Sequence, residues 1–227
     1  MKIWRKYLAN WYYCGLALAA LLGGVLVFFW NSLSILQRLS WLNLIGLLVH
    51  QFEEYGFPGG FPIIMNMGIR HSDIPDRYPL NQFSAFLVNV VVGYIMYSLP
   101  IIFPEAIWLG IPPIVFGLGQ VIGHGFVFGR SYRSHYSPGL IACILFHLPI
   151  GILYLHYVIV NHMASAGTWL VGIGIDFFVA GFIFNFCVYR LMARKDSKYP
   201  FTEKETARFH SAQRIEQTSK REGKTHA

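Results

Sequence analysis

Three ionisable side chains lie close together at the end of a strongly apolar stretch: His50, Glu53 and Glu54. If this stretch is helical, His50 and Glu54 lie one turn apart on the same face, and Glu53 lies beside them at the i,i+3 position. Histidine nitrogens and carboxylate oxygens bind zinc, and they also bind iron and manganese. The stretch therefore predicts a helix end that contributes ligands to a divalent metal, with zinc favoured.

A second histidine, His124, follows Gln120 at i,i+4 spacing much later in the chain. With His50 and Glu54 it would give a metal three protein ligands and leave one position for water, whose pKa the metal would lower toward neutral. We expect Glu53 to act as general base or to orient a ligand, and Gln120 to bind substrate or support His124. Because carboxylates are few, a two-metal carboxylate-bridged site is less favoured.

Four further side chains are possible accessory residues. They are His135, Tyr136, Ser137 and His147. The first three precede Pro138, which is a good first residue of a helix. His147 would lie about 13 Å along that helix from Pro138. Taken singly, His135 is more typical of a loop histidine, and His147 of a histidine packed between helices.

The elements that must position these residues are membrane helices. The chain of 227 residues is 55% hydrophobic and 13% charged, whereas soluble domains carry about 25% charged residues. Continuous apolar runs of about twenty residues predict an all-α polytopic membrane bundle and not a β-barrel. We expect a single transmembrane domain over 1–192, followed by a basic tail over 193–227. The expected spans are 11–30, 33–54, 83–103, 106–128, 138–162 and 168–192.

The charge distribution predicts an orientation. Six spans place both termini on one side, and most basic residues of the loops and tail lie on that side, so the positive-inside rule makes it cytoplasmic. The net charge of +7 then indicates contact between the basic tail and anionic lipid headgroups, and not nucleic acid. Thr202 and Glu205 predict a capped surface helix in this tail, and the last ten residues are expected to be disordered. We expect an integral protein of the plasma membrane or a bacterial inner membrane.

Three signatures resemble one family. The sequence His50-Gln51-Phe52-Glu53-Glu54 is similar to the motif that names the HXXEE family of multi-pass membrane proteins. That family's Asn-x-x-x-His signature reads Gln120 to His124 here, and its Tyr-Asn-Pro-Gly segment reads Tyr136-Ser137-Pro138-Gly139. The resemblance covers about 49–151. It implies an enzyme site built from the histidines and glutamates, and it implies no substrate.

Three function classes remain in view. The first is a metal-dependent hydrolase of the cytoplasmic leaflet that acts on a lipid or a membrane-borne peptide. The second is a proton- or metal-coupled transporter or cation-binding membrane protein, for which Asp176 would extend the path across the membrane. The third is a non-catalytic assembly partner, in which the glutamate pair is incidental. The three cysteines, all within apolar runs and far apart, argue against a disulfide framework or a cysteine metal site.

Overall fold

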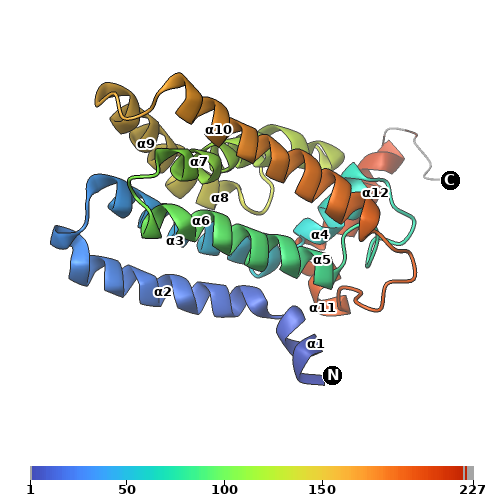
Figure 1. Cartoon of the computed structure of the whole chain (residues 1–227). Coiled ribbons are helices and arrows are strands. Elements are labelled where there is room, and N and C mark those ends of the chain that lie inside the picture. Colours follow the sequence, from blue (N-terminus) through green and yellow to red (C-terminus); the bar gives the residue numbers. More distant parts are fainter. Residues whose placement is uncertain (1, 222, 224–227) are drawn as a thin grey trace.

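The computed structural model describes residues 2–221 and 223, and every regular element within them is helical (Figure 1). The long segments are α2 (Trp11–Phe29), α3 (Ile35–Tyr55), α5–η3–α6 (Gln82–Phe86, Leu87–Val92, Gly93–Ile102), α7–η4 (Ile107–Ile122, Gly123–Val127), α8–η6–α9 (Leu140–Ala142, Cys143–His147, Leu148–Val160) and α10–η7 (Ala166–Phe177, Phe178–Leu191). The short ones are α1 (Lys2–Leu8), η1 (Trp30–Ser32), α4 (Phe61–Ile63), η2 (Ile64–Ile69), η5 (Phe128–Tyr132), α11 (Glu203–Thr206), η8 (Arg208–His210) and α12 (Ser211–Arg221). The stretches η2, η3, η4, η6 and η7 are π-helical.

Five helical segments of the described chain are long and apolar enough to cross a membrane. They are Trp11–Ser32, Gln82–Ile102, Ile107–Tyr132, Leu140–Val160 and Ala166–Leu191. Their apolar side chains cover the outside of the bundle, as expected where the surrounding solvent is lipid. The prediction of an all-α membrane bundle is confirmed, with five such helices where the sequence indicated about six.

The remaining predicted span corresponds to α3, which differs from the other five in polarity and position. Its 21 residues suffice to cross about 30 Å of hydrocarbon, but Arg38, Asn43 and His50 lie along it. Thirteen of its 21 residues are buried, because α2, α6, η6 and α9 all pack against it. A helix that carries this many polar groups is stable at membrane depth when its neighbours shield it from lipid.

A capping box fixes where α3 begins. The Ser34 hydroxyl accepts the Gln37 backbone N–H at 3.2 Å, and the Gln37 side chain accepts the Ser34 N–H at 3.0 Å. At the other end the helix stops at Tyr55, before a Gly/Pro-rich turn. His50 and Glu54 therefore lie in its last two turns.

The C-terminal segment packs across one end of the bundle. The predicted capping box is present: the Thr202 hydroxyl accepts the Glu205 N–H, and the Glu205 carboxylate accepts the Thr202 N–H. That carboxylate also accepts a hydrogen bond from Gln82 at 2.7 Å, which ties the segment to the start of α5. Further along, Ile215 is buried against Ile63 and Ile64.

Helix α12 lies at the same end of the bundle as α1, and it packs on η2 and η5 (Figure 1). The prediction of disorder in the last ten residues is wrong for 218–221, which form the end of α12 because Ile215 anchors that helix. Residues 222 and 224–227 lie outside the described residues.

Candidate metal centre

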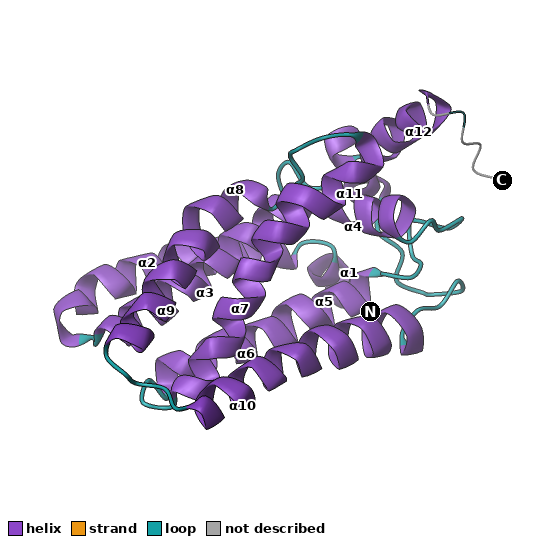
Figure 2. Cartoon of the chain, turned by 90° about the horizontal axis from the view of Figure 1, so that it is seen from above, coloured by secondary structure: helices purple, strands orange, loops and turns teal. Residues whose placement is uncertain are grey.

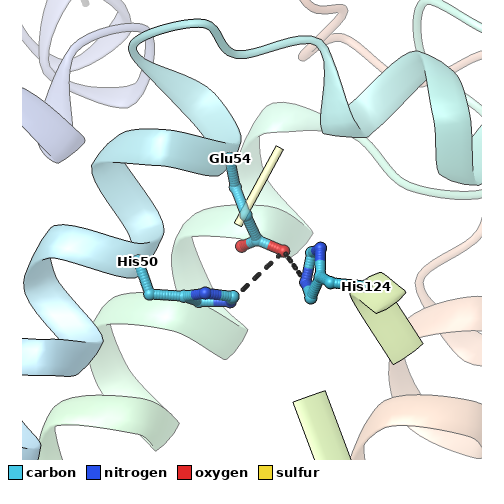
Figure 3. Close-up of side chains that lie close together, drawn as sticks. All are labelled: His50, Glu54 and His124. Atoms are coloured by element: carbon cyan, nitrogen blue, oxygen red, sulfur yellow. Dashed lines mark ion pairs between the residues drawn. The ribbon is translucent and has the colours of Figure 1, made fainter. Parts of the chain in front are cut away.

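Three side chains from two helices converge inside the bundle (Figure 3). His50 and Glu54 come from α3, and His124 comes from the π-helical stretch η4. Oε1 of Glu54 lies 3.6 Å from Nε2 of His50 and 3.2 Å from Nε2 of His124. One oxygen and two nitrogens thus lie within 4.8 Å of one another, on side chains that are all buried. The fold thereby brings the second and fourth predicted spans together.

The backbone partner of His50 fixes one of its ring protons. Its Nδ1 lies 3.0 Å from the carbonyl oxygen of Gly139, and the thiol of Cys143 lies 3.4 Å from the same nitrogen. A carbonyl oxygen can only accept, so Nδ1 carries a proton, and in the neutral ring Nε2 carries the lone pair. That lone pair lies on the side of the ring that faces Glu54.

The same tautomer follows for His124. The Ser137 hydroxyl donates to the His124 carbonyl oxygen at 3.0 Å, which uses its only hydrogen. The contact of 2.9 Å between His124 Nδ1 and the Ser137 oxygen must then be donated by the ring. In the neutral ring Nε2 of His124 keeps its lone pair. Among the described residues neither this atom nor Nε2 of His50 forms a hydrogen bond, and both face Oε1 of Glu54 at ion-pair distance.

Gly139 lies against the imidazole rings of both His50 and His124. Its φ of +111° is in the region that favours glycine. A Cβ atom there would lie 2.5 Å from Cε1 of His124 and 2.8 Å from Cε1 of His50, closer than carbon atoms pack. Only glycine permits the backbone to approach both imidazoles and to offer its carbonyl to His50.

His147 is adjacent to this group and similarly oriented. Its Nδ1 lies 3.0 Å from the amide oxygen of Asn43, so in the neutral ring its Nε2 also carries a lone pair, and this atom has no hydrogen-bond partner among the described residues. Its ring centroid is 5.5 Å from that of His50, and Gly117 leaves room for it, because a Cβ there would lie 2.9 Å from Nδ1. His147 lies outside the set whose donor atoms are within 4.8 Å of one another.

Glu53 points away from this set. Its Oε1 accepts hydrogen bonds from the Tyr136 hydroxyl at 2.9 Å and the Ile141 N–H at 3.2 Å, and its Oε2 accepts from the Ala142 N–H at 2.8 Å. These partners are the segment before α8 and the free amides at its start. The geometry favours a role in positioning the Ser137–Gly139 segment over the expected role of general base.

The two other candidate residues lie in different surroundings. Gln120 does not support His124, whose Nδ1 is bonded to Ser137, but lines two adjoining cavities beside Glu54, of about 240 Å³ and about 30 Å³. His135 is exposed in the loop before α8. Gln120 is thus placed to contact a molecule in these cavities, and His135 is not.

Two of the donor separations fit a zinc-sized ion. Ligands held tetrahedrally at about 2.0–2.1 Å from zinc lie about 3.3–3.4 Å from one another, and the separations of 3.6 and 3.2 Å between Glu54 and the two histidines bracket that value. Each histidine also donates its other ring N–H to a carbonyl or hydroxyl oxygen, as metal-bound histidines do. The rings of Phe61 and Phe128 pack against His124 and shield the group.

Sequence reasoning missed three residues of this site. The sequence shows Gly139 only as part of a signature, and its positive φ required the structure. The role of Asn43 required the structure too, because its partner His147 lies 104 positions away. The sequence places Cys143 within an apolar run, and nothing in its neighbourhood there indicates contact with His50.

Comparison with known proteins identifies a family. A family model described as a protein of unknown function with an HXXEE motif matches residues 41–154, which is 114 of the 227 residues. That range includes every residue of the candidate centre. No curated protein and no solved structure matches this chain.

Proposed function

Because the chain belongs to this family of HXXEE proteins, whose description assigns no activity, we propose a function from the chemistry of the site: a metal-dependent membrane hydrolase that acts on a lipid or membrane-borne peptide. The observation that carries the proposal is the convergence of three buried donor atoms, two of them imidazole lone pairs directed by Gly139 and Ser137. A buried group of this kind is costly unless its charges are paired or it coordinates a metal.

The residues divide into ligands and supports. His50, Glu54 and His124 hold a divalent cation, with zinc favoured and iron or manganese as alternatives. When bound, such a cation acts as a Lewis acid, which polarises a substrate oxygen and lowers the pKa of bound water. Gln120, on the cavity wall beside Glu54, offers an amide that orients substrate.

Metal analysis tests the proposal. The full chain is purified in detergent without chelators, beside His50→Ala, His124→Ala and the control His156→Ala, whose histidine is exposed on α9. We expect near-stoichiometric zinc, iron or manganese in the wild type and the control, and its loss in the two site variants. Wild-type protein that neither carries metal nor takes up added zinc, while folded, would sink the proposal.

Activity separates a hydrolase from a passive metal site. Metal-loaded wild type is screened against ester, amide and phosphoester lipids and against membrane-anchored peptides, with His124→Ala as the blank. Turnover that follows metal content across the variants supports hydrolysis. Bound metal without turnover of any of these bonds excludes the hydrolase class that we propose.

A second candidate function is proton-coupled transport. Buried polar atoms without a hydrogen-bond partner among the described residues continue beyond the donor set, at His147 Nε2, Tyr97 Oη and Asp176 Oδ1. The Tyr97 ring lies 6.1 Å from that of His147, and Ile175, next to Asp176, packs in the same cluster as Tyr97. Ion flux into liposomes that Asp176→Asn abolishes, with metal content unchanged, would favour this function over hydrolysis.

We also propose that the end of the bundle that carries α1 and α12 faces the cytoplasm, where basic side chains contact anionic headgroups. Lys204, Arg214 and Lys220 are exposed there, whereas Arg208 donates to the Tyr12 hydroxyl and the Tyr55 carbonyl within the protein. Protease protection of the C-terminal segment in sealed vesicles of known orientation tests the topology.

A further inference from the structure

A cavity of about 240 Å³ lies beside the candidate centre, enclosed by the end of α3, by α4 and η2, and by η3, α7 and η7. Figure 2 shows α10, which continues into η7, lying alongside the α5–α6 segment that contains η3. Phe61, Phe116, Phe128 and Phe184 line its wall. A cavity lined by several phenylalanine rings is suited to a molecule with a substantial apolar part.

The cavity reaches the donor set. Its lining includes Glu54, Gln120 and Asn89, and the smaller cavity of about 30 Å³ shares these three residues and adds His50. Gln51 also lines the smaller cavity; it is fully buried, and its Oε1 has no hydrogen-bond partner among the described residues. The inner end is therefore polar and continuous with the carboxylate and imidazole of the site.

The outer end carries a cation. Arg70, which is exposed, is the lining residue with a positive charge among those described. Its Nη2 donates to Asn185 at 3.0 Å, and its guanidinium lies 4.5 Å from the centre of the Tyr189 ring. The Asn185 contact uses one of five N–H donors, so a side chain already held in place retains donors for an anion.

The lining extends from the end of one candidate span into the spans themselves. Val88 and Asn89 lie within the span Gln82–Ile102, and Phe184 lies within Ala166–Leu191. Arg70 follows η2, in the segment between candidate spans, and contacts Asn185 and Tyr189 toward the end of the span Ala166–Leu191. A molecule that occupied the whole cavity would place its charged end at the membrane edge and its apolar part at membrane depth.

We propose that this cavity binds the substrate, and that the substrate is a lipid with an anionic headgroup. The head, a phosphate or a carboxylate, pairs with Arg70, and the chain lies along the phenylalanines. Part of the molecule then reaches the inner end of the cavity and faces Gln120 and Glu54. The inference rests on the proposed hydrolase for the chemistry, while the binding itself does not require metal.

Photo-crosslinking tests the binding. Full-length protein in zwitterionic nanodiscs is labelled with three diazirine lipids, which carry a phosphate head, a carboxylate head or an uncharged glycerol head. Variants are Arg70→Gln, Ala180→Phe to narrow the cavity, and the control Arg77→Gln, whose arginine pairs with Asp76 in the same loop. Labelled residues are mapped by mass spectrometry.

We expect at least one anionic probe to label η3 and η7 in the wild type and in Arg77→Gln. Loss of one charge-assisted hydrogen-bonded contact should weaken this labelling about tenfold in Arg70→Gln, and Ala180→Phe should abolish it. Whichever head group labels more strongly identifies the source. Labelling confined to the outer surface, or equal anionic labelling in Arg70→Gln, overturns the inference.

The metal variant separates this inference from the proposed function. In His124→Ala we expect labelling of the cavity to persist although the metal is lost. Wild type that binds no metal but labels in an Arg70-dependent way leaves the lipid site standing and removes the metalloenzyme. Wild type that holds metal but labels independently of Arg70 leaves the metal site and removes the anionic-lipid assignment.

Discussion

The hydroxyl of Ser137 donates a hydrogen bond to the carbonyl oxygen of His124 at 3.0 Å and accepts one from Nδ1 of the same histidine at 2.9 Å. One side chain thus satisfies a backbone acceptor in the π-helical stretch and sets the tautomer of the imidazole. Two residues further on, the Gly139 carbonyl oxygen accepts a hydrogen bond from Nδ1 of His50 and so orients that ring. A single short segment before α8 therefore orients both histidines of the candidate centre.

Removal of the Ser137 hydroxyl should weaken metal binding without removing a ligand. In Ser137→Ala the His124 ring loses the acceptor that fixes its proton on Nδ1, and losing such a support typically costs about 10–100-fold in metal affinity. Zinc affinity is measured by competition with a chelating dye. Ser131→Ala, which removes a hydroxyl from the nearby η5, is the control. Equal affinity in both variants would show that Ser137 does not orient the ligand.

Gly139→Ala should disrupt the site through sterics. The left-handed backbone costs a non-glycine residue about 1–2 kcal/mol, and the added methyl must also displace the His124 or His50 ring. We expect a lower melting temperature and loss of bound metal. Gly125→Ala is the matched control, because a Cβ there meets only Leu140 at an ordinary 3.7 Å. If Gly139→Ala retained wild-type metal content, the close approach of the backbone would be unimportant.

Glu53 and Tyr136 should be energetically coupled. Their hydrogen bond links α3 to the segment before α8, and burial raises the pKa of Tyr136, with the Glu53 charge adding to the effect. The phenol is thus a donor at neutral pH, and its contribution to stability persists below about pH 10 and is lost as pH rises through the raised pKa.

A double-mutant cycle measures that coupling. We expect Glu53→Gln and Tyr136→Phe each to destabilise the protein by about 1–3 kcal/mol, and the double variant by less than the sum. Strict additivity would contradict the positioning role. If Glu53→Gln instead kept full stability and metal but lost turnover, the role of general base would stand.

Docking of the C-terminal segment should depend on pH. Burial raises the pKa of the Glu205 carboxyl, against the hydrogen bonds that Thr202 and Gln82 donate to it. Because the folded-state pKa is the higher one, the docked state is favoured most below about pH 4.5 and loses stability as pH rises through the raised pKa. We expect the protection of the α11 and α12 amides against hydrogen exchange, corrected for the intrinsic pH dependence of exchange, to be higher at about pH 4 than at about pH 7.

Glu205→Gln is the control for that experiment, because an amide of the same shape does not titrate. Its exchange in α11 and α12, after correction for the intrinsic pH dependence, should be flat over this range. A wild-type profile as flat as that of the variant would mean that the Glu205 carboxyl is not the titrating group.

The local chemistry of the ligand helix was accessible from sequence. The i,i+4 spacing of His50 and Glu54 places both on one helix face wherever the helix lies. The long apolar runs around this helix indicate segments whose surroundings are lipid. The membrane bundle, the pairing of His50 with Glu54 and the capped helix at Thr202 follow from such short-range rules. The polar residues of α3 are also typical of a helix that packs against protein.

Long-range geometry was decided by the tertiary structure. The direction of the Glu53 carboxylate depends on where α8 begins, 87 positions away in sequence at Leu140, and no spacing rule encodes that contact. The orientation of the three histidine rings required the partners Gly139, Ser137 and Asn43, which lie 89, 13 and 104 positions in sequence from His50, His124 and His147. The cavity from Arg70 to Glu54 likewise exists only because η7 packs beside η3. Sequence by itself determined which groups bear chemistry, since residue type and helical period are local, whereas packing determined which of them meet.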